Sequence, residues 1–228
     1  FIELQTTMDN HLGVMLHSGS RNFGYRIADY YNAKAEELNS KWGLDAIKKQ
    51  KLAFLPVDHK LGEEYLKWVD LALDFAYENR QKMMHEILRI LGDTVKKYAS
   101  WDMEASLEFD CHHNYVALEE HFGKQVWVHR KGAVRAGKGD KCIIPGAMGV
   151  HSYLAEGLGN EDSFSSCSHG AGRRMSRKAA KDAFKVNEVM DFFKAKDIVL
   201  GKRDKSDAAD EFHAAYKDLD TVMANQAD

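Results

Sequence analysis

Residues 61–98 carry the longest regular pattern in the sequence, and this pattern limits the folds that the chain can adopt. Apolar side chains recur there at the three- and four-residue spacing of one helical face. The clearest part runs from Glu63 to Tyr98 and predicts one long helical region whose apolar stripe packs into a core. Similar spacing predicts a second helix from Phe23 to Leu38. The stripe of the long helix consists of Tyr65, Trp68, Val69, Ala72, Ala76, Met83, Ile87 and Ile90.

The sequence changes character after Trp101, where short apolar runs separated by glycines replace the helical pattern. Helices are expected to return at 172–184, at 187–194 and from near Tyr216. The mixture lacks a regular β-α-β alternation, so it predicts an α+β fold: a mixed or antiparallel β-sheet core with surrounding helices. Strands are expected at 1–4, 13–16, 107–110, 125–129, 142–144, 150–154 and 198–200.

Composition limits the classes of partner. The 228 residues suit one sizeable domain, or at most two, and the formal net charge of -3 gives no bulk attraction to nucleic acid. A site for a polyanion must therefore be a local patch.

Three cysteines without a CxxC pair argue against a disulfide framework and predict a reducing, cytoplasmic setting. No apolar run is long enough to span a bilayer, so no membrane partner is expected.

Both ends of the sequence are unusual. Phe1 is not a methionine and begins a run typical of the inside of a strand. The helical pattern from Tyr216 onward stops without a cap. We therefore expect a fragment of a longer protein.

The segment from Ser166 to Arg177, SCSHGAGRRMSR, places His169 in a turn of small residues. Three arginines follow, at what the pattern predicts to be the start of a helix. Small residues let the backbone approach a ligand closely, helix starts attract anions, and guanidinium groups pair with phosphate oxygens. The segment thus indicates a histidine nucleophile facing a phosphate. The alternative is a glycine-containing loop with a surface histidine beside a solvated basic helix.

Two further histidines follow predicted strands. His17 begins HSGSR, and His113 lies in the run CHHNYV. Imidazoles from separate strand ends can converge on one metal ion, although hydrogen-bonded structural histidines are the competing interpretation. Cys111, just before the paired histidines, is either a ligand or a buried structural thiol, and we favour the thiol.

Two glycine-containing turns complete the set of candidate segments. Residues 129–135 either line a phosphate track or form a solvated edge, because the run HRKGAVR is basic and flexible. The turn PGAMG at 145–149 could lie against a nucleotide through its backbone. The sequence contains neither a P-loop nor a strand–GxGxxG–helix unit, so those two kinds of nucleotide site are not supported.

Taken in order, these segments resemble the RtcB family, the GTP-dependent RNA ligases of tRNA splicing and RNA repair. The resemblance covers nearly the whole chain, with residues 39–103 matching mainly in helical character. It implies an RtcB-like fold in a single catalytic domain over 1–228, incomplete at both ends. The matching runs are HSGSR (17–21), CHHNYV (111–116), HRKGAVRAG (129–137), PGAMG (145–149), SHGAGRRMSR (168–177) and AYKDLDTVMA (215–224).

The resemblance implies an enzyme that joins an RNA 3′-phosphate or 2′,3′-cyclic phosphate end to a 5′-hydroxyl end. The implied cofactors are GTP and Mn²⁺, with two ions in the complete site. The RNA partners would be tRNA halves or broken RNA ends, and an activating protein partner is left open. By position, His169 resembles the histidine that carries GMP, while His17 and His113 resemble manganese ligands.

The resemblance also implies two sets of contact residues. Contacts to RNA phosphates or to the triphosphate are implied for Arg21, Arg173 and Arg177. Contacts to the nucleotide are implied for Phe1, Ile2, Glu3, His113, Asn114, Pro145, Gly146, Ala147, Met148, Ser152, His169, Gly170, Ala171 and Gly172.

The chain departs from the family pattern in three places. The family's D-x-x-C metal ligands and the histidine of its N-H-F-I-E run are not in this sequence, nor is a C-terminal lysine that contacts the nucleotide. Ala147 stands where many members have serine, so one nucleotide hydrogen bond is expected to be missing. With two metal ligands instead of five, the chain alone is expected to have little or no ligase activity.

Two other functions compete with ligation. The first is a metal-dependent phosphoesterase that uses His17 and His113 and needs no GTP. The second is a non-catalytic, truncated paralogue that binds RNA through the basic residues 173–178.

Overall fold

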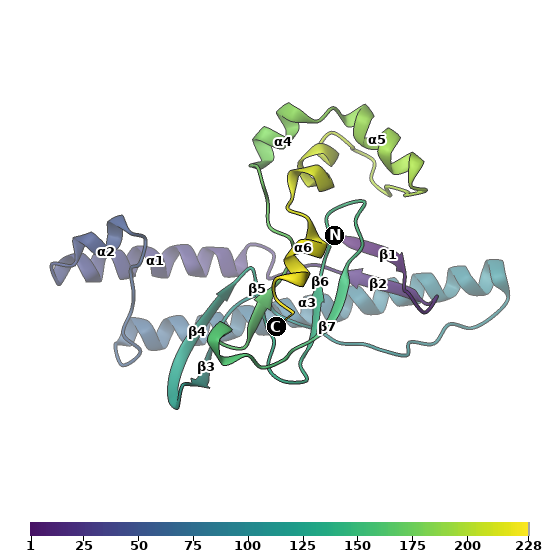
Figure 1. Cartoon of the computed structure of the whole chain (residues 1–228). Helices are drawn as coiled ribbons and strands as arrows, with labels where there is room; N and C mark the ends of the chain where they lie inside the picture. Colours follow the sequence, from purple (N-terminus) through teal and green to yellow (C-terminus); the bar gives the residue numbers. More distant parts are fainter. Residues whose placement is uncertain (228) are drawn as a thin grey trace. The chain divides into compact units, whose positions relative to one another are not determined.

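The computed structural model describes residues 1–227 and divides the chain into two compact units, one from Phe1 to Asp110 and one from Cys111 onward. Helices and antiparallel strand pairs together confirm the predicted α+β class (Figure 1). Within the described residues, the strands form separate two-stranded pairs instead of one continuous sheet. The single catalytic domain over 1–228 stays a prediction, and the two units are described in turn.

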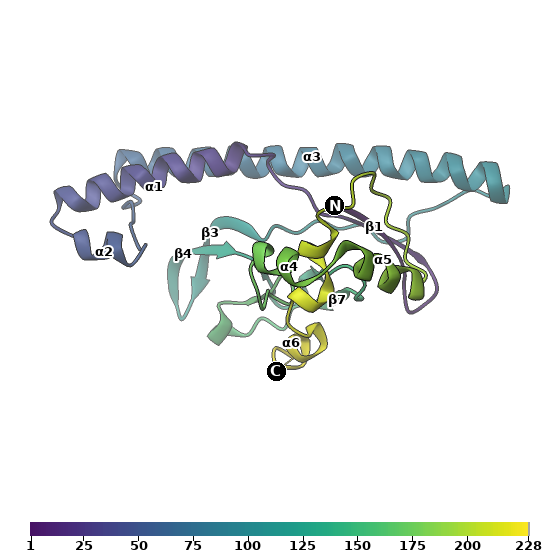
Figure 2. The ribbon, with the colours of Figure 1, turned by 90° about the horizontal axis from the view of Figure 1, so that it is seen from above.

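The first unit is built on two helices, α1 (Phe23–Lys41) and α3 (Lys60–Ala99), which lie side by side over part of α3 (Figures 1 and 2). Ile27 and Tyr31 of α1 pack against Ala72 of α3. Both predicted helices are confirmed. The connection between them contains a short helix, α2 (Asp45–Lys49), which the sequence pattern did not indicate.

The ends of α3 follow from local chemistry. His59 precedes the helix, and its Nδ1 accepts a hydrogen bond from the Leu61 N–H, which satisfies one of the unpaired donors of the first turn. At the other end Ser100 adopts a left-handed conformation with φ of 60° and stops the helix. None of the described helices is both long enough and apolar enough to cross a membrane.

The first unit also contains a hairpin of β1 (Ile2–Thr6) and β2 (Leu12–Leu16). The strands are antiparallel, with Ile2 opposite Leu16 and Glu3 opposite Met15. This register places Phe1 opposite His17, just beyond the end of β2. The strands expected at 1–4 and 13–16 are thereby confirmed.

Three antiparallel pairs form the β-structure of the second unit. They are β3 (Asn114–His121) with β4 (Lys124–Lys131), β5 (Ala133–Arg135) with β8 (Ser166–Ser168), and β6 (Lys141–Ile144) with β7 (Tyr153–Glu156). The strands expected at 125–129 and 142–144 are confirmed, and the one expected at 150–154 begins later, at Tyr153. Strand β3 was not predicted, because its polar run LEEH resembles a loop.

Two predicted strands are wrong. Residues 107–110 have no strand structure, and Asp110 instead accepts a hydrogen bond from Arg80 of α3, with 2.6 Å between Nη2 and Oδ1. Residues 198–200 are also irregular, and Ile198 and Leu200 pack against the cluster around Val189. Side-chain contacts therefore replace strand pairing at Asp110 and at the apolar residues Ile198 and Leu200.

The helices of the second unit are α4 (Arg177–Ala183), α5 (Val186–Ala195), α6 (Leu219–Ala224) and the 3-10 turns η1 (Glu161–Ser163), η2 (Ala208–Glu211) and η3 (His213–Ala215). The predicted start of a helix at Gly172 is wrong. Gly172 has φ of +74°, Arg173 forms a β-bridge with Tyr216, and α4 begins only after the Ser176 cap. A helix start therefore does not directly follow His169.

Candidate functional site

His113 and His169 come together in the second unit. His113 directly precedes β3, and His169 directly follows β8. Their ring centroids are 4.6 Å apart, and the ring planes meet at 23°, so the imidazoles are stacked. The expectation was that histidines at strand ends, His17 and His113 above all, share a metal ion, and this stays a prediction; what the structure shows is that the His113 and His169 rings stack. His17, the third candidate, belongs to the first unit.

Gly132 holds both histidines through its backbone. Its N–H donates to the His113 carbonyl oxygen at 2.7 Å, and its own carbonyl oxygen lies 2.7 Å from His169 Nδ1. The residue has φ of +68°, a conformation that glycine adopts without strain. A Cβ at this position would lie 3.0 Å from His169 Cε1. Glycine is thus favoured both by the backbone conformation and by the closeness of the imidazole.

The contact with Gly132 fixes the tautomer of His169. A carbonyl oxygen only accepts hydrogen bonds, so His169 Nδ1 must carry the proton. In the neutral ring the lone pair then lies on Nε2. His169 consequently has the protonation pattern of a nucleophile that attacks through Nε2.

Asn114 orients His113. Its Oδ1 accepts a hydrogen bond from the Gly132 N–H at 3.2 Å, which turns its amide nitrogen toward His113. The distance from Asn114 Nδ2 to His113 Nδ1 is 3.0 Å. Asn114, Gly132 and the two histidines therefore form one hydrogen-bonded and stacked group, which we call the histidine pair site.

The turn at 145–149 is held by Ser152 and by backbone packing. The Gly146 N–H donates to Ser152 Oγ at 3.0 Å, and a Cβ on Gly146 would lie 2.2 Å from the His151 carbonyl oxygen. Gly170 lies beside this turn, because a Cβ there would be 3.6 Å from the Pro145 carbonyl oxygen. The turn thus lies next to the residue that follows His169.

The other predicted nucleotide residues of the second unit differ in exposure. Ala171 is buried with Ile144, and Met148 packs against the core cluster around Val189. The Ala147 carbonyl accepts a hydrogen bond from the Val150 N–H at 3.0 Å, and Gly172 is exposed. Their nucleotide contacts stay predictions.

The two predicted phosphate-binding arginines of the second unit differ in how they are held. The Arg173 guanidinium donates to the Met175 carbonyl oxygen at 3.0 Å and to the Tyr216 hydroxyl at 2.8 Å. Arg177 has a side chain that is 70% exposed and pairs with Glu211 at 2.9 Å. Arg177 is therefore better placed to exchange its partner for a phosphate than Arg173.

In the first unit, four predicted site residues lie close together. The Phe1 and His17 rings are 5.0 Å apart, and each residue's backbone N–H donates to the other's carbonyl at 2.9 Å. Burial raises the pKa of the Glu3 carboxyl, while Ile2 is exposed. Arg21, also exposed, has φ of 50° just before α1. The hairpin thus gathers Phe1, Ile2, Glu3 and His17.

Sequence reasoning missed the role of Arg130, which it placed on a phosphate track or a solvated edge. Both interpretations are wrong for this residue, because its side chain is 1% exposed. Its guanidinium donates to Glu119 Oε2 at 2.9 Å, to the Phe164 carbonyl oxygen at 2.8 Å and to Ser166 Oγ at 2.9 Å. The hydrogen bonds from Arg130 lower the pKa of Glu119 to about 2. The pairing of β3 with β4 was the missing signal.

The cysteines pack into a core instead of forming a ligand set. Cys111, Cys142 and Cys167 lie in one cluster with Val134 and Ala136. Burial raises the pKa of Cys142 to about 12 and also raises that of Cys167. Thiols with raised pKa values, such as those of Cys142 and Cys167, are poor nucleophiles. The packing of Cys111 in the same cluster agrees with the interpretation of a structural thiol.

Residues 1–227 contain no group of three or more histidine, cysteine, aspartate or glutamate side chains that could hold a metal ion. The histidine pair site supplies imidazoles but no further ligand type.

The α+β fold, together with an imidazole whose lone pair is assigned to Nε2, defines a candidate site for covalent catalysis by histidine. The model of the family described as "tRNA-splicing ligase RtcB" matches residues 1–228. The chain belongs to this RtcB family.

Individual relatives agree with the family match. The chain is 41% identical to the RNA-splicing ligase RtcB of Escherichia coli K12 over 229 residues, which cover 100% of the chain and 55% of that protein. It is 35% identical to the tRNA-splicing ligase RtcB of Thermococcus kodakarensis and 34% to that of Methanococcus maripaludis, covering 92% of the chain and 47% of each relative. The chain spans about half the length of these curated relatives.

Proposed function

We propose that the protein containing this chain is an RNA ligase that joins RNA 3′-phosphate or 2′,3′-cyclic phosphate ends to 5′-hydroxyl ends. The observation that carries the proposal is the His169–Gly132 contact of 2.7 Å, which assigns the lone pair to Nε2. Family membership supplies the reaction class, since the relatives are named RNA-splicing and tRNA-splicing ligases. Substrates would be tRNA halves or broken RNA ends.

The chemistry begins with attack of His169 Nε2 on the α-phosphorus of GTP. A nitrogen–phosphorus bond forms, the bond from the α-phosphorus to the bridging oxygen breaks, and pyrophosphate leaves. Positive charge develops on the ring during this step. The Gly132 carbonyl oxygen accepts the hydrogen bond from His169 Nδ1–H and so stabilises the positive charge on the ring. A carboxylate has this role in other sites that depend on histidine.

In the following steps the nitrogen–phosphorus bond breaks as GMP passes from His169 to the RNA 3′-phosphate and activates it. A 2′,3′-cyclic phosphate end would first be opened by water to give that 3′-phosphate. The 5′-hydroxyl of the second RNA end then attacks this phosphorus, and GMP leaves. In this scheme the turn at 145–149, with Ser152, contacts the nucleotide, and the exposed Arg177 side chain contacts a phosphate.

We propose GTP and Mn²⁺ as cofactors on the strength of family membership. Manganese would neutralise the negative charge of the triphosphate, and His17 and His113 are its proposed imidazole ligands. We also propose a cytoplasmic location, which suits the three free cysteines.

The proposal is tested by mass spectrometry of the whole protein that contains this chain after incubation with GTP and Mn²⁺, because the chain alone is expected to have little or no activity. We expect a GMP-sized adduct that is acid-labile and alkali-stable, and that is lost in His169→Ala. His85→Ala, an exposed histidine on α3, is the matched control and should form the adduct normally.

Other outcomes would overturn the proposal. An adduct that persists in His169→Ala would show that His169 is not the nucleophile. Phosphate release or RNA cleavage with metal but without GTP would favour the phosphoesterase. Salt-sensitive RNA binding without any response to GTP or Mn²⁺ would favour the non-catalytic paralogue.

A further inference from the structure

Gln226 holds the residue that directly precedes His169. Its Oε1 accepts two hydrogen bonds from Ser168, one from the backbone N–H at 2.9 Å and one from Oγ at 3.0 Å. The amide orientation is fixed by chemistry, because both Ser168 groups donate and only the amide oxygen accepts. The Nε2 of Gln226 lies 3.1 Å from Met223 Sδ, which agrees with this orientation.

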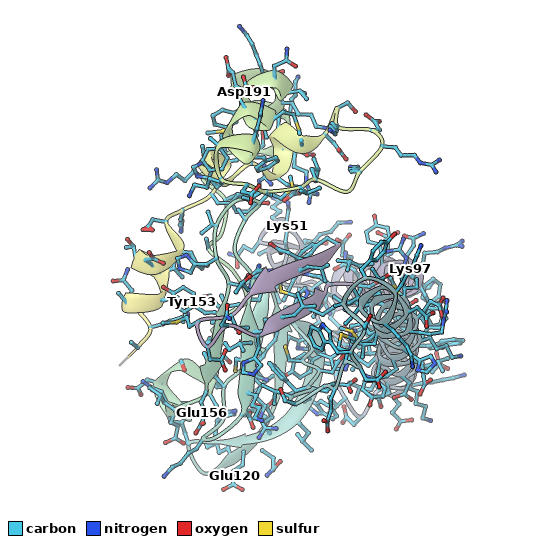
Figure 3. The ribbon with its side chains drawn as sticks, turned by 90° about the vertical axis from the view of Figure 1, so that its right-hand side faces the viewer. Lys51, Lys97, Glu120, Tyr153, Glu156 and Asp191 are labelled. Carbon is cyan, nitrogen blue, oxygen red and sulfur yellow. The ribbon has the colours of Figure 1, made fainter. Side chains whose placement is uncertain are left out.

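The helix that precedes Gln226 is itself well anchored. Leu219 is 3% exposed and, with Met223, packs against the cluster of Ile144 and Ala171. On another side, Asp220 Oδ1 lies 2.8 Å from His151 Nε2 and accepts a hydrogen bond from the Tyr153 hydroxyl at 2.7 Å. Tyr153 lies beside α6 in Figure 3. Gln226 is thus presented to Ser168 from a helix that is fixed by packing and by hydrogen bonds.

We propose that Gln226 is a positioning residue for His169: by accepting both donors of Ser168, it fixes the backbone from which the imidazole projects. This inference rests on the proposed role of His169 as the nucleophile. It assigns to α6 and the residue after its cap a function in the chemical step, although Gln226 contacts neither ring nitrogen of His169.

The geometry explains why a single hydrogen-bond acceptor, Gln226 Oε1, can position the imidazole of His169. His169 is held on its ring side by the Gly132 carbonyl, at 2.7 Å from Nδ1. Gln226 holds the chain on the other side, at the peptide of Ser168. Nucleophilic attack depends on atoms being placed to a fraction of an ångström, and a misplacement of about 1 Å can cost about 100-fold in rate. Loss of the Gln226 acceptor should therefore slow nucleotide transfer.

Three substitutions separate this role from a structural one. Gln226→Met keeps the length of the side chain but removes the acceptor. Gln226→Glu keeps acceptor oxygens for both Ser168 donors. Asn225→Met places the same methionine at the neighbouring exposed position and serves as the matched control.

The first measurement is hydrogen exchange of the Ser168 amide by NMR, which needs no catalytic activity. We expect exchange to become at least about 10-fold faster in Gln226→Met and to stay near the original rate in Gln226→Glu and Asn225→Met. Unchanged protection in Gln226→Met would show that the contact does not hold Ser168, and the inference would fail.

The second measurement is the rate of GMP adduct formation over a range of GTP concentrations. We expect the rate at saturating GTP to fall at least about 10-fold in Gln226→Met, with the half-saturating GTP concentration unchanged and the rate restored in Gln226→Glu. An unchanged saturated rate, or a change confined to GTP affinity, would overturn the inference. If the unsubstituted protein forms no adduct, the proposed function fails instead, and the amide exchange still tests the contact.

Discussion

The β3–β4 hairpin of the second unit carries a polar cluster at each of two places, and the two clusters are built in opposite ways. Near Asn114, at the start of β3, the histidine pair site is held by the Asn114 amide and by the backbone of Gly132. Further along the same hairpin, Arg130 and Glu119 form a buried, charged cluster with Tyr115 and Phe164.

This difference indicates that the buried charged cluster stabilises the fold, whereas the histidine pair site is available for chemistry. In the buried cluster each described Arg130 nitrogen already donates to a protein oxygen, so the guanidinium is not available to a ligand. The histidine pair site is only partly buried, and the contact of His169 Nδ1 with the Gly132 carbonyl assigns the lone pair to Nε2. We therefore expect substitutions in the buried cluster to change mainly the free energy of unfolding, and those at the histidine pair to change mainly adduct formation.

The largest loss of stability is expected for Arg130→Met. The substitution removes the guanidinium from the buried Glu119 carboxylate, which is left with its His121 contact at 2.9 Å, and breaking a buried ion pair in this way costs about 3–5 kcal/mol. Urea unfolding followed by circular dichroism measures the change. Lys131→Met, at the exposed neighbouring position, is the control and should change stability by less than about 0.5 kcal/mol. Equal effects of both substitutions would contradict the division of roles.

A smaller effect is expected when Glu119 is protonated. Its pKa in the folded protein is about 2, against an ordinary value of 4.5, so the stabilisation is complete above about pH 4.5 and is lost as the pH falls toward 2. After allowance for solvent screening, the loss is about 2 kcal/mol. Urea unfolding at several pH values should show this dependence, and Glu119→Gln should flatten it. An equally steep dependence in Glu119→Gln would assign the acid sensitivity to other carboxyls.

Gly132→Ala should cost about 1 kcal/mol in stability, because alanine is strained at φ of +68°. It should also slow adduct formation about 10-fold, because the new Cβ would press on His169 Cε1. Gly139→Ala is the matched control: Gly139 has φ of +83°, but a Cβ there meets no atom within 4 Å. The control should lose similar stability and keep the original rate of adduct formation.

The smallest change in stability is expected for His113→Ala, at less than about 0.5 kcal/mol, because the ring is only partly buried. Adduct formation should nevertheless fall at least about 10-fold, since the stacked partner of His169 is removed. Urea unfolding and mass spectrometry of the same samples measure both quantities. A stability loss as large as that of Arg130→Met would remove the distinction between the two clusters.

The regular and local parts of this fold were predictable from sequence. The stripe along α3 repeats over many turns, so its helical spacing gives a strong signal. The runs at 198–200 and 107–110 were wrongly predicted to be strands, because a short apolar or mixed run does not indicate whether a partner strand exists. Arg173 also resembled the start of a helix, but its β-bridge with Tyr216 joins residues far apart in the sequence.

At the candidate site, too, only the features that are local in the sequence could be predicted. The motif around His169 identified the histidine itself, because small residues and arginines beside it favour phosphate chemistry. The groups that hold it could not be predicted, since Gly132 and Gln226 approach from distant parts of the sequence. Arg130 was misplaced for a related reason: its burial depends on the pairing of β3 with β4, and β3 was not predicted.

The most direct test of the account is to determine which nitrogen of His169 carries GMP. Heteronuclear NMR of the adduct, made with ¹⁵N-labelled histidine, detects the coupling between the phosphorus and the bonded ring nitrogen. The account predicts coupling to Nε2, because Nδ1 donates to the Gly132 carbonyl. Coupling to Nδ1, or attachment of GMP to any other residue, would contradict it.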